Sequence, residues 1–230
     1  ISDCLVGSEM CIRDSKVFDG VVIKLSKDFN NISLLGDDIL IAGSGVLDKT
    51  LSEFAMENNL SGFEFLSCIP GTIGGGIRMN AGCFGSEFKD ILLSIQAIDK
   101  LGNVVTIPRK NIEFDYRKNN LSNDLIFLSA SFKGKKSEFL KIRNETNRLK
   151  TKKNKNQPNK IKTSGSTFKN PIKQTEKKVW QLIEESVSLD KSFGDAYISK
   201  KHCNFFVNKG NASFEDCLLY TSDAADDDHC

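Results

Sequence analysis

The chain has 230 residues, of which 39% are hydrophobic and 9% aromatic, enough to bury a core in one large or two small domains. Its net charge of +2 at pH 7 reflects nearly balanced basic and acidic residues and by itself indicates no class of partner. The sequence has no run of about eighteen apolar residues and no secretory signal pattern, so we expect no membrane span and no membrane partner.

The seven cysteines and two histidines follow no metal-binding or disulfide pattern. Cys68, Cys83 and Cys203 are isolated in the sequence, and the other four cysteines lie near the ends. Metal ligands usually cluster at short spacing, so we expect no metal site. An odd number of scattered cysteines is typical of a reducing compartment, which favours the cytoplasm.

Short β-branched segments surround one amphipathic helix in the first half of the chain. Strands are predicted at residues 20–25, 38–43 and 124–132, and a hairpin at residues 91–107 around a Gly-Asn turn. A helix is predicted at residues 47–59, where helical spacing is shared by Leu47, Leu51, Phe54, Ala55 and Asn58. The first half is therefore expected to be mixed α+β.

The stretch "IPGTIGGGIRMNAGCFG", residues 69–85, holds six of the seventeen glycines. Glycine permits positive φ and lets a ligand approach the backbone closely, and consecutive N–H groups can then form an anion-binding concavity. Pro70 fixes the entry to the stretch, and apolar side chains are interleaved with the glycines. This composition suits a flat, charged ligand such as a flavin dinucleotide; a tight structural turn is the alternative.

A lysine-rich segment follows, with twelve Lys or Arg and two Glu in residues 133–162. Such a segment can bind a phosphate backbone. However, its single aromatic residue, Phe139, lies on a thin apolar stripe with Ile142, Thr146 and Leu149. We therefore favour a solvated helix that runs into a linker at residues 153–162, and expect no nucleic-acid partner.

The second half is shorter and also mixed. A polar turn is predicted at residues 164–171, a helix at residues 176–188 and a strand at residues 203–208. Residues 211–216 predict a helix start, with Ser213 as N-cap and Asp216 as its capping-box partner.

Four ordered segments resemble the UDP-N-acetylenolpyruvoylglucosamine reductase family. They are "LSGFEFLSCIPGTIGGGIRMNAGCFG" (60–85), "FDYRKN" (114–119), "SGSTFKNP" (164–171) and "GDAYISKKHCNFFVNKGNAS" (194–213). "FDGVVIKLS" (18–26) also fits, so the resemblance covers about residues 16–216. Residues 1–15 and 217–230 do not continue the composition of the middle of the chain, which is rich in Lys, Asn and Ile. They resemble translated sequencing adapters, and we set them aside as non-native ends.

The resemblance implies an α+β fold. An FAD-binding domain of the vanillyl-alcohol-oxidase/PCMH-like type would occupy residues 16–134, and a smaller α+β substrate-binding domain residues 135–216. It also implies a cytoplasmic, monomeric enzyme of peptidoglycan precursor synthesis. Such an enzyme uses FAD and NADPH to reduce UDP-N-acetylglucosamine enolpyruvate to UDP-N-acetylmuramate.

The resemblance assigns catalytic roles to Arg117 and Ser166. The planar, permanently charged guanidinium of Arg117 suits a carboxylate that becomes enolate-like. Ser166 occupies the proton-donor position, where a weakly acidic hydroxyl works only against a strongly basic carbanion.

The other implied site residues bind the cofactor or the substrate. Those expected to contact FAD are Ile69, Pro70, Gly71, Thr72, Gly74, Gly75, Gly76, Asn80, Ala81 and Gly82, with the amides of Gly74–Gly76 facing the cofactor. Those expected to contact the substrate are Tyr116, Lys169 and Asn170, with a looser match at Lys153 and Lys155. Ser199 and His202 belong to a family segment near the site, and for His202 we favour a structural role.

Two departures from the family pattern accompany these assignments. The family's C-terminal catalytic glutamate has no counterpart, and its N-terminal Gly-x-Gly-Ser-Asn loop is replaced by "LVGSEMCIRDS". We therefore expect weak FAD binding and little turnover. The alternatives are another FAD-linked oxidoreductase of the same superfamily, and a non-catalytic flavin- or nucleotide-sugar-binding module.

Overall fold

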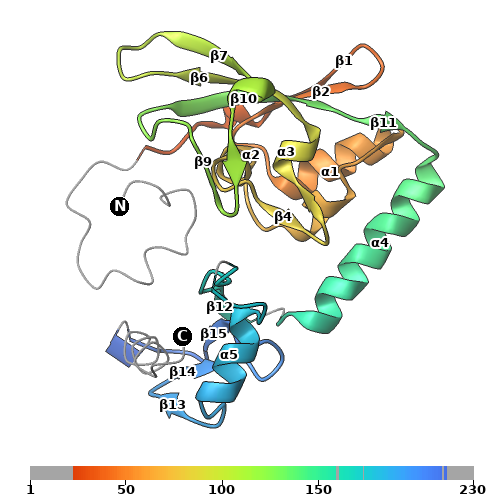
Figure 1. Ribbon diagram of the computed structural model, residues 1–230. Helices are drawn as coiled ribbons and strands as arrows, with labels where there is room; N and C mark the ends of the chain where they lie inside the picture. The colour runs from red at the N-terminus through yellow and green to blue at the C-terminus, as the bar shows by residue number, and fades with distance from the viewer. Residues whose placement is uncertain (1–22, 159–160, 173, 214, 217–230) are drawn as a thin grey trace. The chain divides into compact units, whose positions relative to one another are not determined.

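The structure is a computed structural model that describes residues 23–158, 161–172, 174–213 and 215–216 (Figure 1). These residues divide into two compact units, residues 23–153 and residues 154–216. Both units contain helices and antiparallel strands, which confirms the predicted α+β class. Of the strand predicted at residues 20–25, residues 20–22 lie outside the described residues and residues 23–25 form no strand.

A five-stranded antiparallel sheet forms the framework of the first unit. In sheet order its strands are β1 (Ile32–Leu35), β2 (Ile39–Gly43), β10 (Ile126–Lys133), β6 (Leu92–Ile98) and β7 (Val104–Pro108). Strands β2, β6 and β10 correspond to predicted strands. The hairpin β6–β7 is also confirmed, with a turn at residues 99–103 in which Gly102 has φ +86°.

Helices cover one face of this sheet (Figure 1): α1 (Asp48–Glu57), α2 (Ile73–Arg78) and α3 (Phe88–Ile91). Burial alternates along β2, where Leu40 and Ala42 face the core. Strand β10 keeps Phe127 on the same face as Ala130 and Phe132, because its pairing with β6 is irregular between Phe127 and Ser129.

Helix α1 confirms the helix predicted at residues 47–59. Leu51 and Ala55, one turn apart, are fully buried and form its core-facing stripe. Leu47 is the N-cap residue rather than part of that stripe, and it is 56% exposed.

Short elements connect the main strands and helices of the first unit. The strand pairs are β3 (Leu60–Ser61) with β11 (Lys135–Lys136), β4 (Gly82–Cys83) with β5 (Ser86–Glu87), and β8 (Phe114–Asp115) with β9 (Lys118–Asn119). The 3₁₀ helices are η3 (Lys27–Asn30), η4 (Glu64–Cys68) and η5 (Arg109–Asn111).

Helix α4 (Phe139–Asn156) shifts the predicted domain boundary. Its buried residues are Ile142, Thr146 and Leu149, and Leu149 belongs to the core of the first unit. The units therefore divide at residues 153/154 rather than at 134/135, because most of α4 packs with the sheet-and-helix unit. The linker expected from residue 153 begins later, since the helix continues to Asn156.

The second unit is built on a four-stranded antiparallel sheet and one helix. In sheet order its strands are β12 (Lys162–Ser166), β15 (Phe205–Asn208), β14 (Ala196–Ile198) and β13 (Ser192–Phe193). The predicted helix is α5 (Val179–Ser186). The core of this unit comprises Val179, Ile183, Val187, Ala196, Ile198, Cys203 and Phe206.

Two local predictions for the second unit had different outcomes. The polar turn predicted at residues 164–171 was wrong over its first part, which completes β12 by pairing with β15. The capping box was right: Ser213 N donates to Asp216 Oδ2 at 2.8 Å, and Asp216 N donates to Ser213 Oγ at 3.1 Å.

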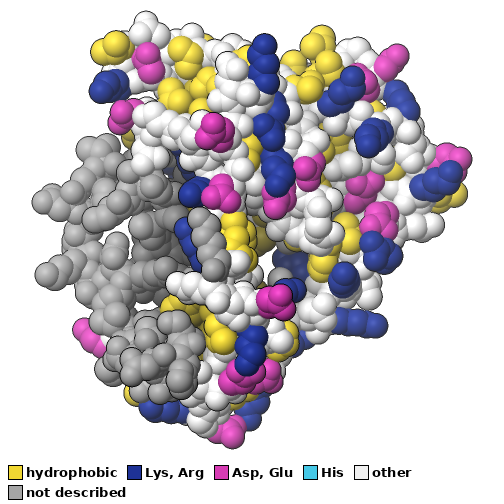
Figure 2. Space-filling view, viewed as in Figure 1, with side chains coloured by type: hydrophobic (Ala, Val, Ile, Leu, Met, Phe, Trp, Pro, Cys, Tyr) yellow, Lys and Arg dark blue, Asp and Glu magenta, His cyan; other side chains and the backbone are white. Residues whose placement is uncertain are grey.

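Basic and acidic side chains are interspersed on the face drawn in Figure 2. Two ion pairs of this kind lie at α4. Lys141 Nζ is 3.3 Å from Oε1 of Glu138, the residue before the helix, and Arg148 Nη2 is 2.6 Å from Glu145 Oε1. Among the described residues, no helix is both long and apolar enough to cross a membrane.

The core around Phe88 generates a stability prediction for Gly76. A Cβ added to Gly76 would lie 2.2 Å from Phe88 Cε2. The Phe88 ring is held in place by two other rings, since its centre lies 6.2 Å from that of Phe65 and 6.0 Å from that of Phe132. Gly76→Ala should therefore lower the free energy of unfolding by about 2 kcal/mol or more, through overpacking.

Urea denaturation followed by circular dichroism measures this loss. Gly102→Ala is the control: its Cβ meets no atom within 4 Å, and only its positive φ opposes the change, at about 1 kcal/mol. Equal losses for the two variants would contradict the packing explanation.

Candidate functional site

The glycine stretch joins η4 to α2 and then to β4. Ile69 and Pro70 follow η4 directly. Thr72 then forms an antiparallel β-bridge with Leu47, the residue before α1. Asp48 N donates to Gly71 O at 3.1 Å, and Ile73 N donates to Val46 O at 2.9 Å. This pairing places the entry of the stretch beside the first turn of α1.

The Gly74–Gly76 amides, expected to face the cofactor, donate hydrogen bonds within the protein. Gly74 N donates to Ser44 O at 2.9 Å, and Gly76 N donates to Thr72 O at 2.8 Å. Gly75 N donates to the Thr72 hydroxyl at 3.5 Å, because Thr72 is the N-cap of α2. The "IGGGIR" segment folds as a helix, so these N–H groups are used inside the protein.

Close packing explains several of the glycines. A Cβ at Gly74 would lie 3.0 Å from Ser44 Cβ, and one at Gly82 would lie 2.4 Å from Ser86 O. A Cβ at Gly71 would lie 2.9 Å from Asp48 Oδ2. Packing within the protein, as in the structural-turn alternative, therefore accounts for Gly71, Gly74 and Gly82.

Asp48 places a buried carboxyl group directly under that entry. The residue is fully buried, and neither carboxylate oxygen has a hydrogen-bond partner. Burial raises the pKa of Asp48 to about 7. A buried carboxyl without a partner favours its neutral form.

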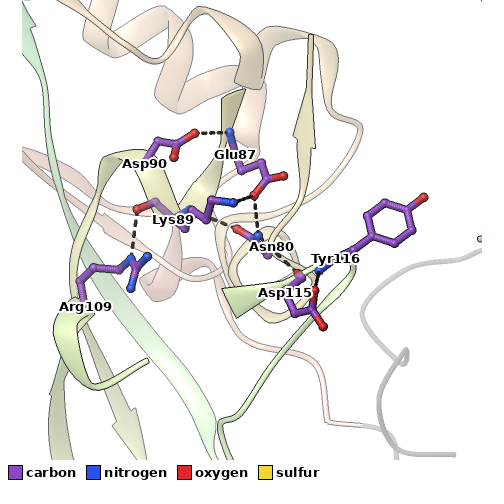
Figure 3. Close-up of polar contacts among 7 residues, drawn as sticks. All are labelled: Asn80, Glu87, Lys89, Asp90, Arg109, Asp115 and Tyr116. Atoms are coloured by element: carbon purple, nitrogen blue, oxygen red, sulfur yellow. Dashed lines mark hydrogen bonds and ion pairs between the residues drawn. The ribbon is translucent and has the colours of Figure 1, made fainter. Parts of the chain in front are cut away.

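Asn80 connects three parts of the first unit (Figure 3). Its Nδ2 donates to Glu87 Oε2 at 2.8 Å and to Asp115 O at 3.4 Å, and its Oδ1 accepts from Lys89 N at 3.1 Å. Asn80 is 5% exposed and has φ 42°. Its side chain therefore positions neighbouring segments. The next two residues, also expected at the cofactor, have other surroundings: Ala81 packs partly buried against the core, and Gly82 is the first residue of β4.

Glu87 and Lys89 complete the polar cluster shown in Figure 3. Lys89 Nζ lies 2.5 Å from Glu87 Oε2, and this hydrogen bond lowers the pKa of Glu87 and raises that of Lys89. Glu87 N donates to Asp90 Oδ2 at 2.8 Å, and Arg109 Nε donates to Lys89 O at 3.1 Å. The cluster fixes the β5–α3 junction against the end of the glycine stretch.

Tyr116 and Arg117 form the two-residue turn between β8 and β9. Arg117 has φ 54°, and its guanidinium carbon lies 5.7 Å from the centre of the Tyr116 ring. Asn119 Nδ2 donates to Ile77 O at 3.1 Å and to Arg78 O at 2.9 Å. The hairpin is therefore fastened to the carboxyl end of α2.

Ser166 lies at the end of β12 in the second unit. Asn204 Nδ2 donates to Ser166 Oγ at 2.7 Å and to Phe168 O at 2.9 Å. Asn204 Oδ1 accepts from Phe168 N at 2.8 Å, and Asn204 is 2% exposed. One buried amide thus fixes the backbone on which Ser166 lies.

The other predicted residues of the second unit differ in exposure and contacts. Lys169 is exposed, whereas Asn170 Oδ1 accepts from Val179 N at 3.0 Å, at the start of α5. His202 stacks edge-on against Phe205 with ring centres 4.8 Å apart, and burial lowers its pKa. Ser199 is 5% exposed, and its Oγ accepts from Lys201 N at 3.3 Å.

The two lysines with a looser family match lie near the end of α4. Lys153 Nζ donates to Cys68 O at 2.8 Å, directly before the glycine stretch, whereas Lys155 is exposed. Among the described residues, no group of three His, Cys, Asp or Glu side chains is arranged to hold a metal ion.

The structure brings the glycine stretch and the Tyr116–Arg117 turn together within the first unit, while Ser166, Lys169 and Asn170 belong to the second unit. Three contributing residues were missed by sequence reasoning: Asp48, Asn119 and Asn204. Asn119 and Asn204 lie within the segments "FDYRKN" and "GDAYISKKHCNFFVNKGNAS" that carry the family resemblance, and that was the available signal. Nothing in the local pattern marked Asp48.

The entry of the glycine stretch has features that fit a flavin cofactor. Ile69 and Thr72 offer partly exposed apolar groups beside the backbone of Gly71, and Pro70 is exposed. Lys150 and Lys153 are close enough to lower the pKa of Cys68, so positive charge lies near the start of the stretch. Apolar surface, accessible backbone and nearby positive charge are what a ring system joined to a pyrophosphate requires.

Family models match both parts of the chain. The model described as "FAD binding domain" matches residues 6–108, and the model described as "UDP-N-acetylenolpyruvoylglucosamine reductase, C-terminal domain" matches residues 157–226. Both matches enter the end segments set aside above, which lie outside the described residues.

Individual relatives agree with these matches. UDP-N-acetylenolpyruvoylglucosamine reductase from Pelagibacter ubique (strain HTCC1062) is 68% identical over 210 residues, covering 91% of this chain and 69% of the relative. The enzyme of the same name from Rickettsia typhi (strain ATCC VR-144 / Wilmington) is 49% identical, covering 91% and 70%. The crystal structure of UDP-N-acetylenolpyruvylglucosamine reductase from Thermus caldophilus superposes with a TM-score of 0.77 at 30% identity, covering 87% of this chain and 71% of that chain.

The fold and these matches define a two-domain, FAD-dependent oxidoreductase. The predicted order, an FAD-binding domain followed by a smaller C-terminal domain, is confirmed. The chain belongs to the UDP-N-acetylenolpyruvoylglucosamine reductase family.

The burial of Asp48 predicts a pH-dependent loss of stability. Its pKa is about 7 when folded and 3.8 ordinarily, so its stabilising contribution is complete below pH 3.8 and is lost as pH rises through 7. Between pH 5 and pH 8, the wild type should lose on the order of 3 kcal/mol of unfolding free energy relative to Asp48→Asn.

Urea titrations at the two pH values measure this difference. Asp124→Asn, on the exposed surface, controls for the loss of one negative charge. An Asp48→Asn difference that stays constant from pH 5 to pH 8 would be the contrary result.

The contacts of Asn204 predict that Asn204→Ala destabilises the second unit. The substitution leaves the N and O atoms of the partly buried Phe168 without their side-chain partner, at a cost of about 2 kcal/mol. Thermal unfolding and amide exchange at Phe168 measure the effect. Asn211→Ala, at an exposed position, should change stability by less than about 0.5 kcal/mol; similar losses for both variants would argue against the anchoring role.

Proposed function

We propose that this chain carries out the NADPH-dependent, FAD-mediated reduction of UDP-N-acetylglucosamine enolpyruvate to UDP-N-acetylmuramate, in the cytoplasm, for peptidoglycan synthesis. Membership of the reductase family supports the reaction class. The observation that carries the proposal at the level of residues is the attachment of the Tyr116–Arg117 turn to α2, at the end of the glycine stretch.

The backbone of Arg117 supports a functional role for its side chain. A non-glycine residue with φ near 54° is held in a sparsely populated conformation, which costs of order 1 kcal/mol and is common at functional sites. Asn119 and Asn80 supply the contacts that maintain this turn. A guanidinium fixed in this way provides a charged, bidentate donor for the substrate carboxylate as negative charge builds on it.

Ser166 supplies the proton in this proposal. Its Oγ accepts a short hydrogen bond from the buried amide of Asn204, which orients the hydroxyl and draws electron density from its oxygen. Both effects favour proton donation from a group that is otherwise a weak acid.

Lys169 and Tyr116 are proposed to contact the substrate, the lysine through its diphosphate or carboxylate. Asn170 contributes by fixing the start of α5, since its side-chain carbonyl is already bound to Val179 N. Ile69, Pro70, Gly71 and Thr72 would hold the FAD. FAD held there would supply hydride transfer from NADPH to the enolpyruvyl double bond.

Flavin binding is the first experimental test. The purified chain is titrated into FAD while flavin fluorescence is followed, and NADPH oxidation is then measured with and without the enolpyruvyl substrate. Weak but saturable binding and slow, substrate-dependent oxidation are expected, in line with the departures from the family pattern at both ends of the chain. A chain that folds, yet neither binds FAD nor oxidises NADPH, would contradict the proposal.

The role of Arg117 gives a kinetic prediction. Arg117→Lys keeps the charge but loses the planar fork, and kcat should fall about 10²- to 10³-fold. FAD affinity should be unchanged. Steady-state NADPH oxidation and flavin titration measure the two quantities. Arg143→Lys, on the exposed face of α4, is the matched control and should keep the wild-type rate; equal rates for both variants would remove Arg117 from the catalytic machinery.

A further inference from the structure

His202 binds the backbone of the turn that leads into β15. Asn204 N donates to His202 Nδ1 at 3.3 Å, and Phe205 N donates to His202 O at 3.0 Å. His202 N in turn donates to Ser199 O at 3.1 Å. One residue therefore holds the segment 199–205 through its amide, its carbonyl and its ring.

The hydrogen bond to the ring defines its protonation state. A backbone N–H can only donate, so Nδ1 of His202 must offer a lone pair, and the proton of the neutral imidazole lies on Nε2. Aromatic contacts hold the half-buried ring in place, since its centre lies 4.8 Å from that of Phe205 and 6.4 Å from that of Trp180 on α5. The imidazole is an acceptor here, and only its neutral form can act as one.

Asn204 connects this turn to Ser166. Its backbone is bound on both sides, because its N–H reaches His202 Nδ1 and its O accepts from Thr167 N at 2.9 Å. The residue is 2% exposed, and its side-chain Nδ2 donates to Ser166 Oγ at 2.7 Å. Two hydrogen bonds therefore lead from the imidazole, through Asn204, to the hydroxyl of Ser166.

We propose that His202 is a positioning residue for Ser166: its neutral imidazole accepts from Asn204 N and so holds the amide that orients the serine hydroxyl. Protonation of the ring places an N–H on Nδ1, opposite the N–H of Asn204. Two donors cannot hydrogen-bond, so the turn gives way and Asn204 Nδ2 loses its direction toward Ser166. The effect on catalysis rests on the function proposed above, whereas the coupling of the three side chains does not.

Burial decides at which pH this coupling is lost. It lowers the pKa of His202 below its ordinary value of 6.5, because the charged imidazolium is disfavoured away from water. β15 carries no ionisable residue, and the titratable side chains on the other elements at the ring are Lys200, Lys201 and Cys203 in its own turn, with Glu184 and Glu185 on α5. The lysines and glutamates among them are exposed, where water and salt screen their charge. The accepting form is therefore present at neutral pH and is lost as pH falls below 6.5.

NMR on the full chain without FAD or substrate tests the coupling independently of activity. Between pH 5 and pH 8, the imidazole nitrogen shifts of His202 are followed together with the side-chain amide of Asn204 and the Cβ of Ser166. We expect an unprotonated Nδ1 at pH 8, and Asn204 and Ser166 signals that change with the same midpoint as the ring. A proton on Nδ1 at pH 8, or constant Asn204 and Ser166 signals while the ring titrates, would overturn the proposal.

Two variants separate the acceptor from the ring. His202→Asn keeps an acceptor near the position of Nδ1 that does not titrate, whereas His202→Phe keeps an aromatic ring against Phe205 and Trp180 but has no acceptor. In His202→Phe, kcat for substrate-dependent NADPH oxidation should fall about tenfold with KM unchanged, the ratio that one lost hydrogen bond produces. His202→Asn should recover most of this loss. A wild-type kcat in a folded His202→Phe, checked by circular dichroism, would leave His202 with a packing role alone.

The pH profile of kcat supplies a readout that a merely structural histidine would not move. The wild type should lose rate as pH falls below 6.5, and His202→Asn should lack this acid limb. His229→Asn changes the other histidine of the chain, which lies outside the described residues, and as the matched control it should keep the limb. An acid limb that persists in His202→Asn would count against the proposal.

A half-reaction distinguishes failure of this role from failure of the proposed function. Reduction of the FAD-loaded protein by NADPH, without substrate, requires no proton from Ser166, so its rate should be equal in the wild type and in both His202 variants. If the wild type is not reduced at all, the proposed function fails, and the NMR titration still decides the role of His202.

Discussion

Two buried or half-buried side-chain amides hold the site of the first unit together. Asn119 binds the last carbonyls of α2, and Asn80 binds both the β5–α3 junction and the β8–β9 hairpin (Figure 3). The Tyr116–Arg117 turn therefore has a fixed position relative to the glycine stretch. The pairing of β8 with β9 holds the turn in which Arg117 has a positive φ, and the contacts of Asn119 fasten that hairpin to α2. The placement of a strongly charged side chain beside a glycine-rich backbone depends on this constraint.

The glycine stretch combines packing and exposure in different parts. Its helical part is glycine-rich because Phe88 and Ser44 approach the backbone closely. Its entry, at Ile69–Thr72, leaves backbone and apolar surface accessible above the buried carboxyl of Asp48. One short segment thus contributes to core packing and leaves accessible backbone at its entry, because small residues allow several elements to converge.

Sequence reasoning predicted the elements whose signals are local. The stripe of Leu51 and Ala55 in α1 and the reciprocal capping of Ser213 and Asp216 were right, because each depends on residues within a few positions. The division of the two compact units after residue 153 was not predicted, since the thin apolar stripe of α4 does not reveal which core receives Leu149. The hydrogen bonds that the Gly74–Gly76 amides make within the protein were also not predicted, because their acceptors include Ser44, thirty residues earlier in the chain.

The sequence by itself determined the α+β class, most of the strands and helices, and the family, since ordered motifs and periodicity are properties of the linear chain. Tertiary structure decided which polar groups meet. Asn204 and Ser166 are 38 positions apart, and Asn119 and Arg78 are 41 positions apart. Such hydrogen bonds form only after the sheets and helices have packed, and no local pattern specifies the partner. The physical reason is that periodicity fixes the face of an element that is buried, whereas a hydrogen bond requires two particular atoms within about 3 Å.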